Sequence, residues 1–299
     1  MGTVEAGAPH ATGDLLNSPD TQRRSGPVLP RMVLGARLHR FRKTRGISRE
    51  EAGKLIRASQ SKICRMELGR VGFKWRDVAD LLTLYQITDE TERTALRALA
   101  SRSNQLGWWQ AYADVVPSWQ QVYLGLEQAA SLIRGYEARF VPGLLQTPGY
   151  ARAVIQFGHA YTAAQALDRL VELQMRRQQI LHAPDAPATW MVIDEAALRR
   201  PIGTMRAQLQ HLIQVCEYPQ VTVQILPFVA GGHAAMGGPI TLLRLPDPDL
   251  SDVVYLEHLT SADYPSDINR YRDILDRLSM QAAPSTETPA ILHQILADT

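Results

Sequence analysis

The side chains that could do chemistry are concentrated in one short segment of this 299-residue chain, and they are basic. Residues 31–76 contain 14 Arg or Lys and three acidic residues, Glu50, Glu51 and Glu67, which gives a local formal charge of +11. The rest of the chain carries −9, so the net charge of +2 conceals the asymmetry. A segment this basic repels itself unless an anion relieves it, and the expected anion is a phosphate backbone.

No pattern typical of a catalytic or metal site accompanies this charge. The sequence lacks HExxH and GxSxG, and the glycine-rich residues 231–238 lack the Lys-Ser/Thr of a phosphate-binding loop. A flexible turn between strands is expected there, with a ligand-gating loop as the alternative. Glu257 and His258 are adjacent in a predicted strand and therefore point to opposite faces. Cys64 and Cys216 are too few for a disulfide framework or a zinc cluster. We expect no enzymatic activity, no metal and no cofactor.

Composition is typical of a globular cytoplasmic protein. Apolar residues make up 45% of the chain and charged residues 21%. No run approaches the eighteen or so consecutive apolar residues of a membrane span. The first thirty residues also lack the apolar segment of a secretory signal. Neither membrane insertion nor secretion is expected.

Residues 32–104 are predicted to form five short helices, and residues 1–31 a disordered tail rich in Gly, Pro, Ser and Thr. The helices are expected at about residues 34–45, 48–56, 59–69, 75–86 and 88–103. Ser48 and Glu51 form a capping box, and Ser59 is a second N-cap. The break of two or three residues between the second and third helices is typical of a helix-turn-helix bundle.

The segment LGARLHRFRKTRGISREEAGKLIRASQSKICRMELGR resembles the DNA-binding domain of the Cro/cI, or XRE-type, regulators. The resemblance lies in the Gly46-Ile47-Ser48 link, the start of the third helix at residues 59–61 and its end at residues 65–69. Arg57 stands where many relatives have a glycine, which suggests a slightly different turn. The resemblance implies that the third helix enters the major groove of double-stranded DNA.

Each polar residue of this motif has an expected role. Ile63 and Met66 must face the bundle, so the outward side chains are expected to contact base edges: Gln60, Ser61, Lys62 and Arg65. Lys62 has a phosphate contact as an equal alternative. Other residues are expected to meet phosphates: Ser48, Arg49, Ser59, Arg40, Lys43 and Arg45. Glu67 is expected to pair with Arg37 or Arg42 and hold the third helix against the first.

Residues 105–283 are predicted to form a second, α+β domain, followed by a tail with a short helix at 284–299. Helices are expected at about 124–138, 163–182, 204–217 and 267–283, and strands at 189–193, 221–226, 240–245 and 253–258. Strands joined by short turns favour an antiparallel sheet with helices on one face. The predicted fold class is therefore mainly α, then α+β.

The second domain resembles the antitoxin-like companion domain of actinobacterial XRE-type regulators, through Trp108-Trp109, the helix containing Glu127, and VPGLLQTPGYARAV. The resemblance implies a sequence-specific regulator, homodimeric on DNA, that responds to a small protein encoded nearby. Two alternatives stay open: a metabolite as the signal, or an interaction module whose basic domain binds nucleic acid without sequence preference.

Overall fold

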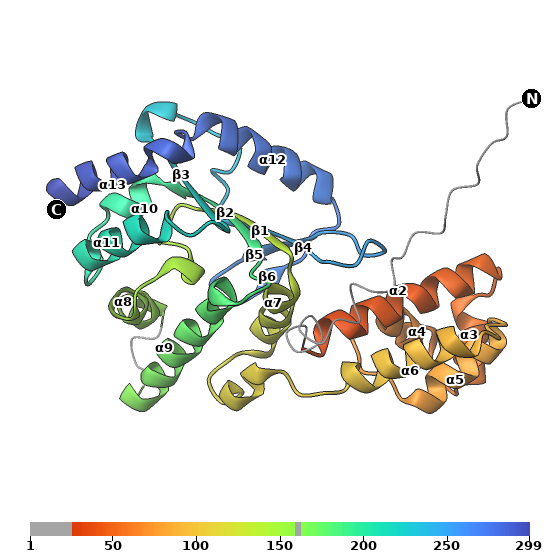
Figure 1. Cartoon of the computed structure of the whole chain (residues 1–299). Helices are drawn as coiled ribbons and strands as arrows, with labels where there is room; N and C mark the ends of the chain where they lie inside the picture. Colours follow the sequence, from red (N-terminus) through yellow and green to blue (C-terminus); the bar gives the residue numbers. More distant parts are fainter. Residues whose placement is uncertain (1–25, 159–162) are drawn as a thin grey trace, which may run out of the picture.

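The computed structural model describes residues 26–158 and 163–299, which form a helical part and a sheet-containing part (Figure 1). The confirmed fold class is α followed by α+β. The predicted tail lies largely outside the described residues, but its last four residues, 28–31, are helical. The helical part contains five helices: α2 (Val28–Thr44), α3 (Arg49–Leu55), α4 (Gln60–Glu67), α5 (Trp75–Leu84) and α6 (Glu90–Ser103).

The helical part is held together by local caps and a dense apolar core. Ser48 accepts a hydrogen bond from the Glu51 amide while Glu51 accepts one from the Ser48 amide, so the predicted capping box is confirmed. Gly46 ends the first helix with a φ of 67°, which suits a residue without Cβ. A Cβ on Gly35 would lie 2.4 Å from the carbonyl oxygen of Met66, so α2 and α4 approach each other backbone to backbone.

The sheet of the second part is mixed. Its six strands lie in the order β3-β2-β1-β4-β5-β6. Their bounds are β1 (Leu132–Glu137), β2 (Ala188–Asp194), β3 (Val221–Leu226), β4 (Ile240–Arg244), β5 (Val253–Glu257) and β6 (Ala262–Asp263). The expectation of a purely antiparallel sheet is wrong for β1, β2 and β3, which pair in parallel. Helices separate these three strands in sequence, and such crossovers return the chain in the same direction. On the other side of β1, the strand pairs β1–β4, β4–β5 and β5–β6 are antiparallel.

Helices cover both faces of the sheet, not one. The first group consists of α7 (Ser118–Ala129), α8 (Pro148–Gly158), α9 (Ala164–Gln178), α10 (Glu195–Arg199) and α11 (Met205–Val215). α13 (Thr288–Ala297) belongs to the same group, whereas α12 (Ile268–Gln281) lies on the opposite face. Short 3-10 turns occupy Trp108–Tyr112, Gly143–Leu145, Gln179–His182, Phe228–Ala230 and Ser285–Glu287. α12 packs on one face through Leu275 and Leu278, whereas α7, α9, α11 and α13 share the core of the other face (Figure 1).

One predicted helix of this part needs correction, and the predicted C-terminal helix is present. The helix expected at 124–138 is two elements, because α7 ends at Ala129 and β1 begins at Leu132. Ile133 and Tyr136 lie on opposite faces of the sheet, and each is buried in the core of its own face. Because β1 is buried on both faces, the spacing of its apolar residues resembles that of a helix. The short helix predicted within 284–299 is present as α13, and its Leu292 and Ile295 are buried in the core of the sheet-containing part.

The two parts share a junction of apolar residues. Val28 and Leu29, in the first turn of α2, are buried in the same core as Trp109 and Leu124 of the second part. A Cβ on Gly125 of α7 would lie 2.2 Å from the Val28 side chain, so the contact is close. Within the described residues, no helix is long and apolar enough to span a membrane.

Candidate nucleic-acid interface

The turn between α3 and α4 sets the geometry of the motif. Arg57 adopts a φ of 53°, the left-handed conformation that favours glycine. The Ala58 amide donates to the Gly53 carbonyl at 2.8 Å, and a Cβ on Gly53 would lie 2.6 Å from the carbonyl oxygen of Ala58. Arg57 therefore takes the backbone conformation that a glycine would take, and the tight turn is kept.

α4 presents one polar side to solvent. Ile63 and Met66 are each 1% exposed and face the bundle, as expected. Gln60, Ser61 and Arg65 are exposed, and their side chains make no hydrogen bond or ion pair within the described part of the chain. Their hydrogen-bonding groups are therefore available to a partner without loss of an existing contact.

Lys62 is the exception on this helix. Its ammonium lies 2.9 Å from the Asp77 carboxylate of α5, and the side chain is about two-thirds buried. This ion pair ties α4 to α5. A contact between Lys62 and a base would require the pair to break, whereas Gln60 and Arg65 need no such step.

Glu67 is the centre of a buried ion-pair cluster that fixes α4. Arg42 donates to its two carboxylate oxygens at 2.5 and 3.0 Å, which confirms one of the two expected partners. His39 and Arg49 each contact it at 2.9 Å. Burial by itself raises the pKa of the Glu67 carboxyl, but the hydrogen bonds from Arg42, His39 and Arg49 outweigh burial and hold the pKa at about 2. The carboxylate thus stays charged and links α4, α2 and α3.

The helix caps leave donors for phosphate. Ser59 accepts from the Lys62 amide, as Ser48 does from Glu51, and both hydroxyls are exposed. A hydroxyl that accepts one hydrogen bond still has its own O–H to donate. Arg49, at the start of α3, is a third exposed in its side chain although it contacts Glu67.

The three remaining basic candidates differ in their contacts. Arg40 forms an exposed ion pair of 2.7 Å with Asp249, which lies in the loop between β4 and β5 of the second part. Arg45 donates to the Tyr85 carbonyl at the end of α5, at 2.9 Å. Lys43 is exposed and contacts no other side chain in the described segments. Of these three, only Lys43 has an ammonium or guanidinium group without an intramolecular partner.

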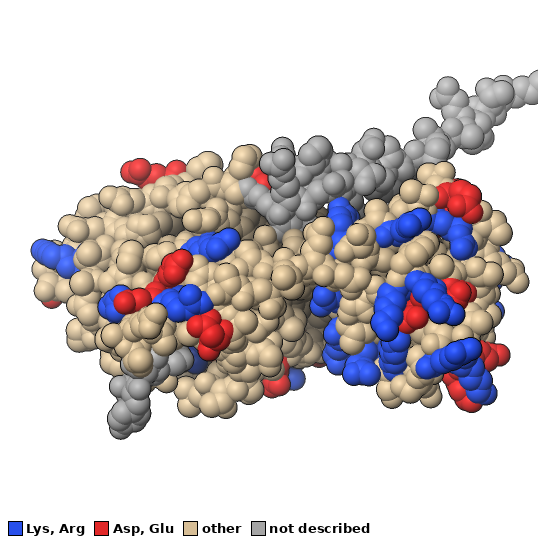
Figure 2. All heavy atoms as spheres, turned by 90° about the horizontal axis from the view of Figure 1, so that it is seen from below, with Lys and Arg blue, Asp and Glu red and all other residues tan. Residues whose placement is uncertain are grey.

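Lys and Arg gather on the helical part. In Figure 2 more of them are visible on the helical part, at the right, than on the sheet-containing part, and acidic residues lie beside basic ones on both parts. This distribution agrees with the charge of the sequence, and it gives the helical part a surface suited to a polyanion.

The sheet-containing part has polar clusters of its own. Glu127 of α7 and Arg177 of α9 form a buried two-pronged ion pair with distances of 2.8 and 2.9 Å. Burial opposes ionisation of Arg177, but the adjacent Glu127 raises its pKa above the ordinary value. Arg177 also donates to Gln174, whose amide donates to the carbonyl of Gly143 in the VPGLLQTPGY segment. One network of ion-paired and hydrogen-bonded side chains thus joins the helix containing Glu127 to the VPGLLQTPGY segment.

The glycine-rich segment between β3 and β4 is anchored at His233. Its Nε2 lies 3.1 Å from the Tyr136 hydroxyl, which donates to Asp194 at 3.0 Å. Asp194 also caps α10, because its side chain accepts a hydrogen bond from the amide of Ala196. His258 contacts Asp263 at 3.0 Å and does not join Glu257. Sequence reasoning missed the Asp194–Tyr136–His233 cluster because its members come from three separate segments.

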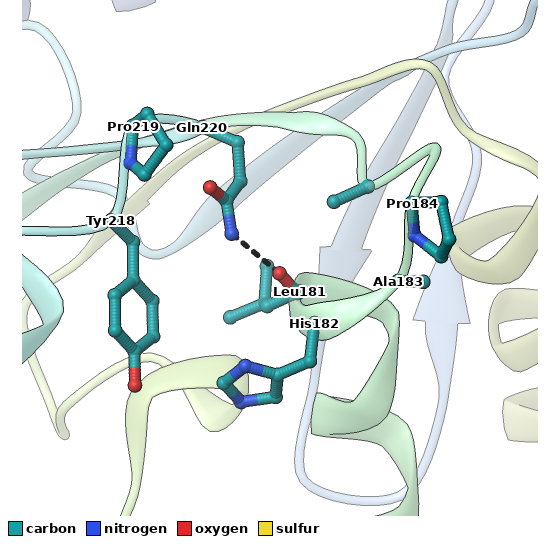
Figure 3. Close-up of a pocket in the computed structure, with 8 residues that line it drawn as sticks. Leu181, His182, Ala183, Pro184, Tyr218, Pro219 and Gln220 are labelled. Atoms are coloured by element: carbon teal, nitrogen blue, oxygen red, sulfur yellow. Dashed lines mark hydrogen bonds between the residues drawn. The ribbon is translucent and has the colours of Figure 1, made fainter.

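A shallow pocket of about 340 Å³ opens at the amino ends of β2 and β3 (Figure 3). Its lining consists of Leu181, His182, Ala183, Pro184, Ala186, Tyr218, Pro219 and Gln220. The Gln220 amide donates to the Leu181 carbonyl, and the His182 and Tyr218 rings meet edge to face. Ligand sites of parallel sheets usually lie at the opposite, carboxyl ends of the strands. Across the described ranges, no three His, Cys, Asp or Glu side chains are grouped to hold a metal.

The geometry defines a helix-turn-helix protein, and comparison with known families agrees. Residues 33–96 match the family described as a helix-turn-helix domain, so the chain is a DNA-binding regulator. Residues 120–294, more than half of the chain, match the domain of unknown function DUF5753, and the protein belongs to that family. No curated protein and no solved structure matches the chain.

Proposed function

We propose that this protein is a sequence-specific transcriptional regulator of the XRE type that binds double-stranded DNA as a homodimer. The observation that carries the proposal is the free polar side of α4, where Gln60, Ser61 and Arg65 are exposed and unpaired on a helix fixed by Glu67. Gln can bond adenine and Arg can bond guanine through two hydrogen bonds each, which is the chemistry of base readout in the major groove.

The remaining candidates divide between bases and phosphates. Lys62 contacts a base if its ion pair with Asp77 breaks on DNA binding. The alternative role of Lys62 is a contact with a phosphate. The phosphate-contacting set consists of Ser48, Arg49, Ser59, Arg40, Lys43 and Arg45. The exposed cap hydroxyls and the free ammonium of Lys43 are the strongest members, because their donors are not already used.

The sheet-containing part supplies dimerisation and receives the signal from a small partner protein, in the manner of an antitoxin. A protein is favoured as the signal because the segment between β3 and β4 exposes three large apolar side chains, Phe228, Val229 and Met236. A metabolite signal would instead predict that the protein purifies alone and responds to a small molecule. Co-purification of a small protein from the native host separates the two.

Selection of genomic DNA fragments by the purified full chain at about 150 mM salt tests the proposal. The expected result is an enriched site with two-fold symmetry and half-sites about one helical turn apart. Enrichment that follows fragment length alone would reject specific readout and leave a general anion-binding surface.

A further inference from the structure

One face of the sheet gathers aromatic and acidic side chains at the carboxyl end of β5. Side chains alternate along a strand, so Tyr255 and Glu257 point to the same face. That face is the one covered by α7 and α9, because Tyr255 shares a core with Tyr123 of α7, whereas Val254 packs with α12 on the opposite face. Tyr264, just after β6, completes the group.

Three tyrosines form a continuous aromatic layer in this group. The rings of Tyr123 and Tyr255 stack with centroids 4.1 Å apart, and Tyr264 lies 5.6 Å from Tyr255. Tyr264 leaves 37% of its surface exposed, whereas Tyr255 is 3% exposed. The Tyr255 hydroxyl is buried and has no hydrogen-bond partner in the described part of the chain. A buried hydroxyl without a partner is uncommon, because its desolvation is not compensated.

The charges around these tyrosines do not balance. Glu127 is fully engaged, since it accepts from the Tyr123 hydroxyl at 2.7 Å and from Arg177 twice. Glu137 contacts Arg139 at 3.4 Å. Glu257 has no ion-pair or hydrogen-bond partner for its carboxylate among residues 26–158 and 163–299. This leaves one negative charge in excess beside the unpaired hydroxyl.

Glu257 is exposed, yet the groups around it disfavour the charged form of its carboxyl. Partial removal of water by the surrounding protein raises the pKa of the Glu257 carboxyl. The positive charges of Arg177 and Arg139 lower this pKa, and the negative charges of Glu137 and Glu127 raise it. Burial raises the pKa of the Tyr255 hydroxyl, and the negative charge of Glu257 raises it further. A cation at this site would stabilise the carboxylate, and its N–H groups would donate to the unpaired Tyr255 hydroxyl.

We propose that Tyr255, Tyr264 and Glu257 form a binding site for an organic cation, an ammonium or guanidinium group. Glu257 supplies the counter-charge, the partly exposed ring of Tyr264 supplies the aromatic face on which such a cation rests, and the unpaired Tyr255 oxygen accepts a hydrogen bond. The site lies at the carboxyl end of the strands, where ligands of such sheets bind. The cation belongs either to a free amine or to a Lys or Arg side chain of a partner protein. The proposal goes beyond DNA binding and does not depend on it.

The test is calorimetric titration of the full chain, without DNA, with four probes: n-butylammonium, tetramethylammonium, and the N-acetyl methylamides of lysine and arginine. At least one probe is expected to bind with saturable heat beyond that of sodium chloride at equal ionic strength. Binding of the simple amines alone identifies a free amine as the source, and binding of the lysine or arginine amide identifies a protein side chain. Heat equal to that of sodium chloride for all four probes overturns the proposal.

Matched variants locate the site. Glu257→Gln should weaken binding about tenfold, and Tyr255→Phe should weaken it without lowering the thermal unfolding temperature, because it removes only the unpaired hydroxyl. Asp263→Asn is the control, since Asp263 pairs in register with Leu256 and so lies on the opposite face of the same hairpin. Equal affinities of wild type and Glu257→Gln would refute the assignment even if a probe binds.

Discussion

Glu67→Gln tests whether the buried ion-pair cluster holds α4 in place. Lowering the pKa of the Glu67 carboxyl from its ordinary 4.5 to about 2 corresponds to about 3 kcal/mol of stabilisation at pH 7. The side chain is 3% exposed and Arg42 is 5% exposed, so solvent screens the pair little. The same interaction viewed from Arg42, whose guanidinium the variant leaves buried without its counter-charge, gives a cost of similar size, about 3–5 kcal/mol, and the two figures are not added. The expected loss of stability in the helical part is therefore about 3 kcal/mol.

Hydrogen exchange of α2 and α4, followed by mass spectrometry at pH 7, measures the loss where it occurs. Glu50→Gln is the matched control, because Glu50 and Lys54 form an exposed pair on α3 whose removal should cost less than about 0.5 kcal/mol. A loss below about 1 kcal/mol for Glu67→Gln would show that the cluster adds little to stability, and the reasoning would fail.

The pH dependence gives a second check with a defined sign. The folded-state pKa of Glu67 is depressed, so its contribution is complete well above pH 4.5 and is lost as the pH falls toward 2. The difference between wild type and Glu67→Gln should shrink from about 3 kcal/mol at pH 7 to about 1.4 kcal/mol at pH 3. Urea unfolding of both proteins at the two pH values measures it. A difference that does not change with pH would assign the stabilisation to packing instead of charge.

Three further predictions concern the DNA-binding surface and its turn. Arg65→Ala should cost about 1–3 kcal/mol of binding and relax preference at one base position, whereas Lys43→Ala should weaken all sequences equally, as competition on duplex libraries would show. Uniform loss in both variants would reject the division of roles. Arg57→Gly should stabilise the protein by about 0.5–1 kcal/mol, because it relieves a left-handed arginine. A lower unfolding temperature would contradict this. Asp249→Asn should tighten duplex binding about two- to fivefold by freeing Arg40. Unchanged fluorescence anisotropy curves would place Arg40 outside the interface.

Local signals predicted the helical part well. Ser48 and Ser59 cap α3 and α4 as expected, since a cap depends on residues three or four positions apart. The pairing of Glu67 with an arginine of the first helix was also predictable, but the sequence left Arg37 and Arg42 as alternatives and the structure shows Arg42. The partners Asp77 and Asp249 were not predictable, since they approach Lys62 and Arg40 only after the helices pack.

The sheet was harder to predict because its topology depends on distant segments. β1 is buried on both faces, so Ile133 and Tyr136 show no alternation and fit a helix equally well. Parallel pairing of β1 with β2 joins residues more than fifty positions apart, such as Ile133 and Thr189. For the same reason the group around Tyr255 has no signature in the sequence.

The ion pairs reduce the free positive charge of residues 31–76. Asp77 and Asp249 come from outside residues 31–76 and each neutralise one of its cations, while Glu67 engages both Arg42 and Arg49. Counting every Lys and Arg therefore overstates the number of phosphates that one protomer can neutralise, and so the steepness of its salt dependence. The ion pairs reduce the non-specific attraction of the protein to DNA phosphates. They do not involve the exposed hydrogen-bond donors of Gln60, Ser61 and Arg65 on α4. This distribution raises the share of binding energy that depends on base contacts, which favours a sequence-specific regulator over a general polyanion binder.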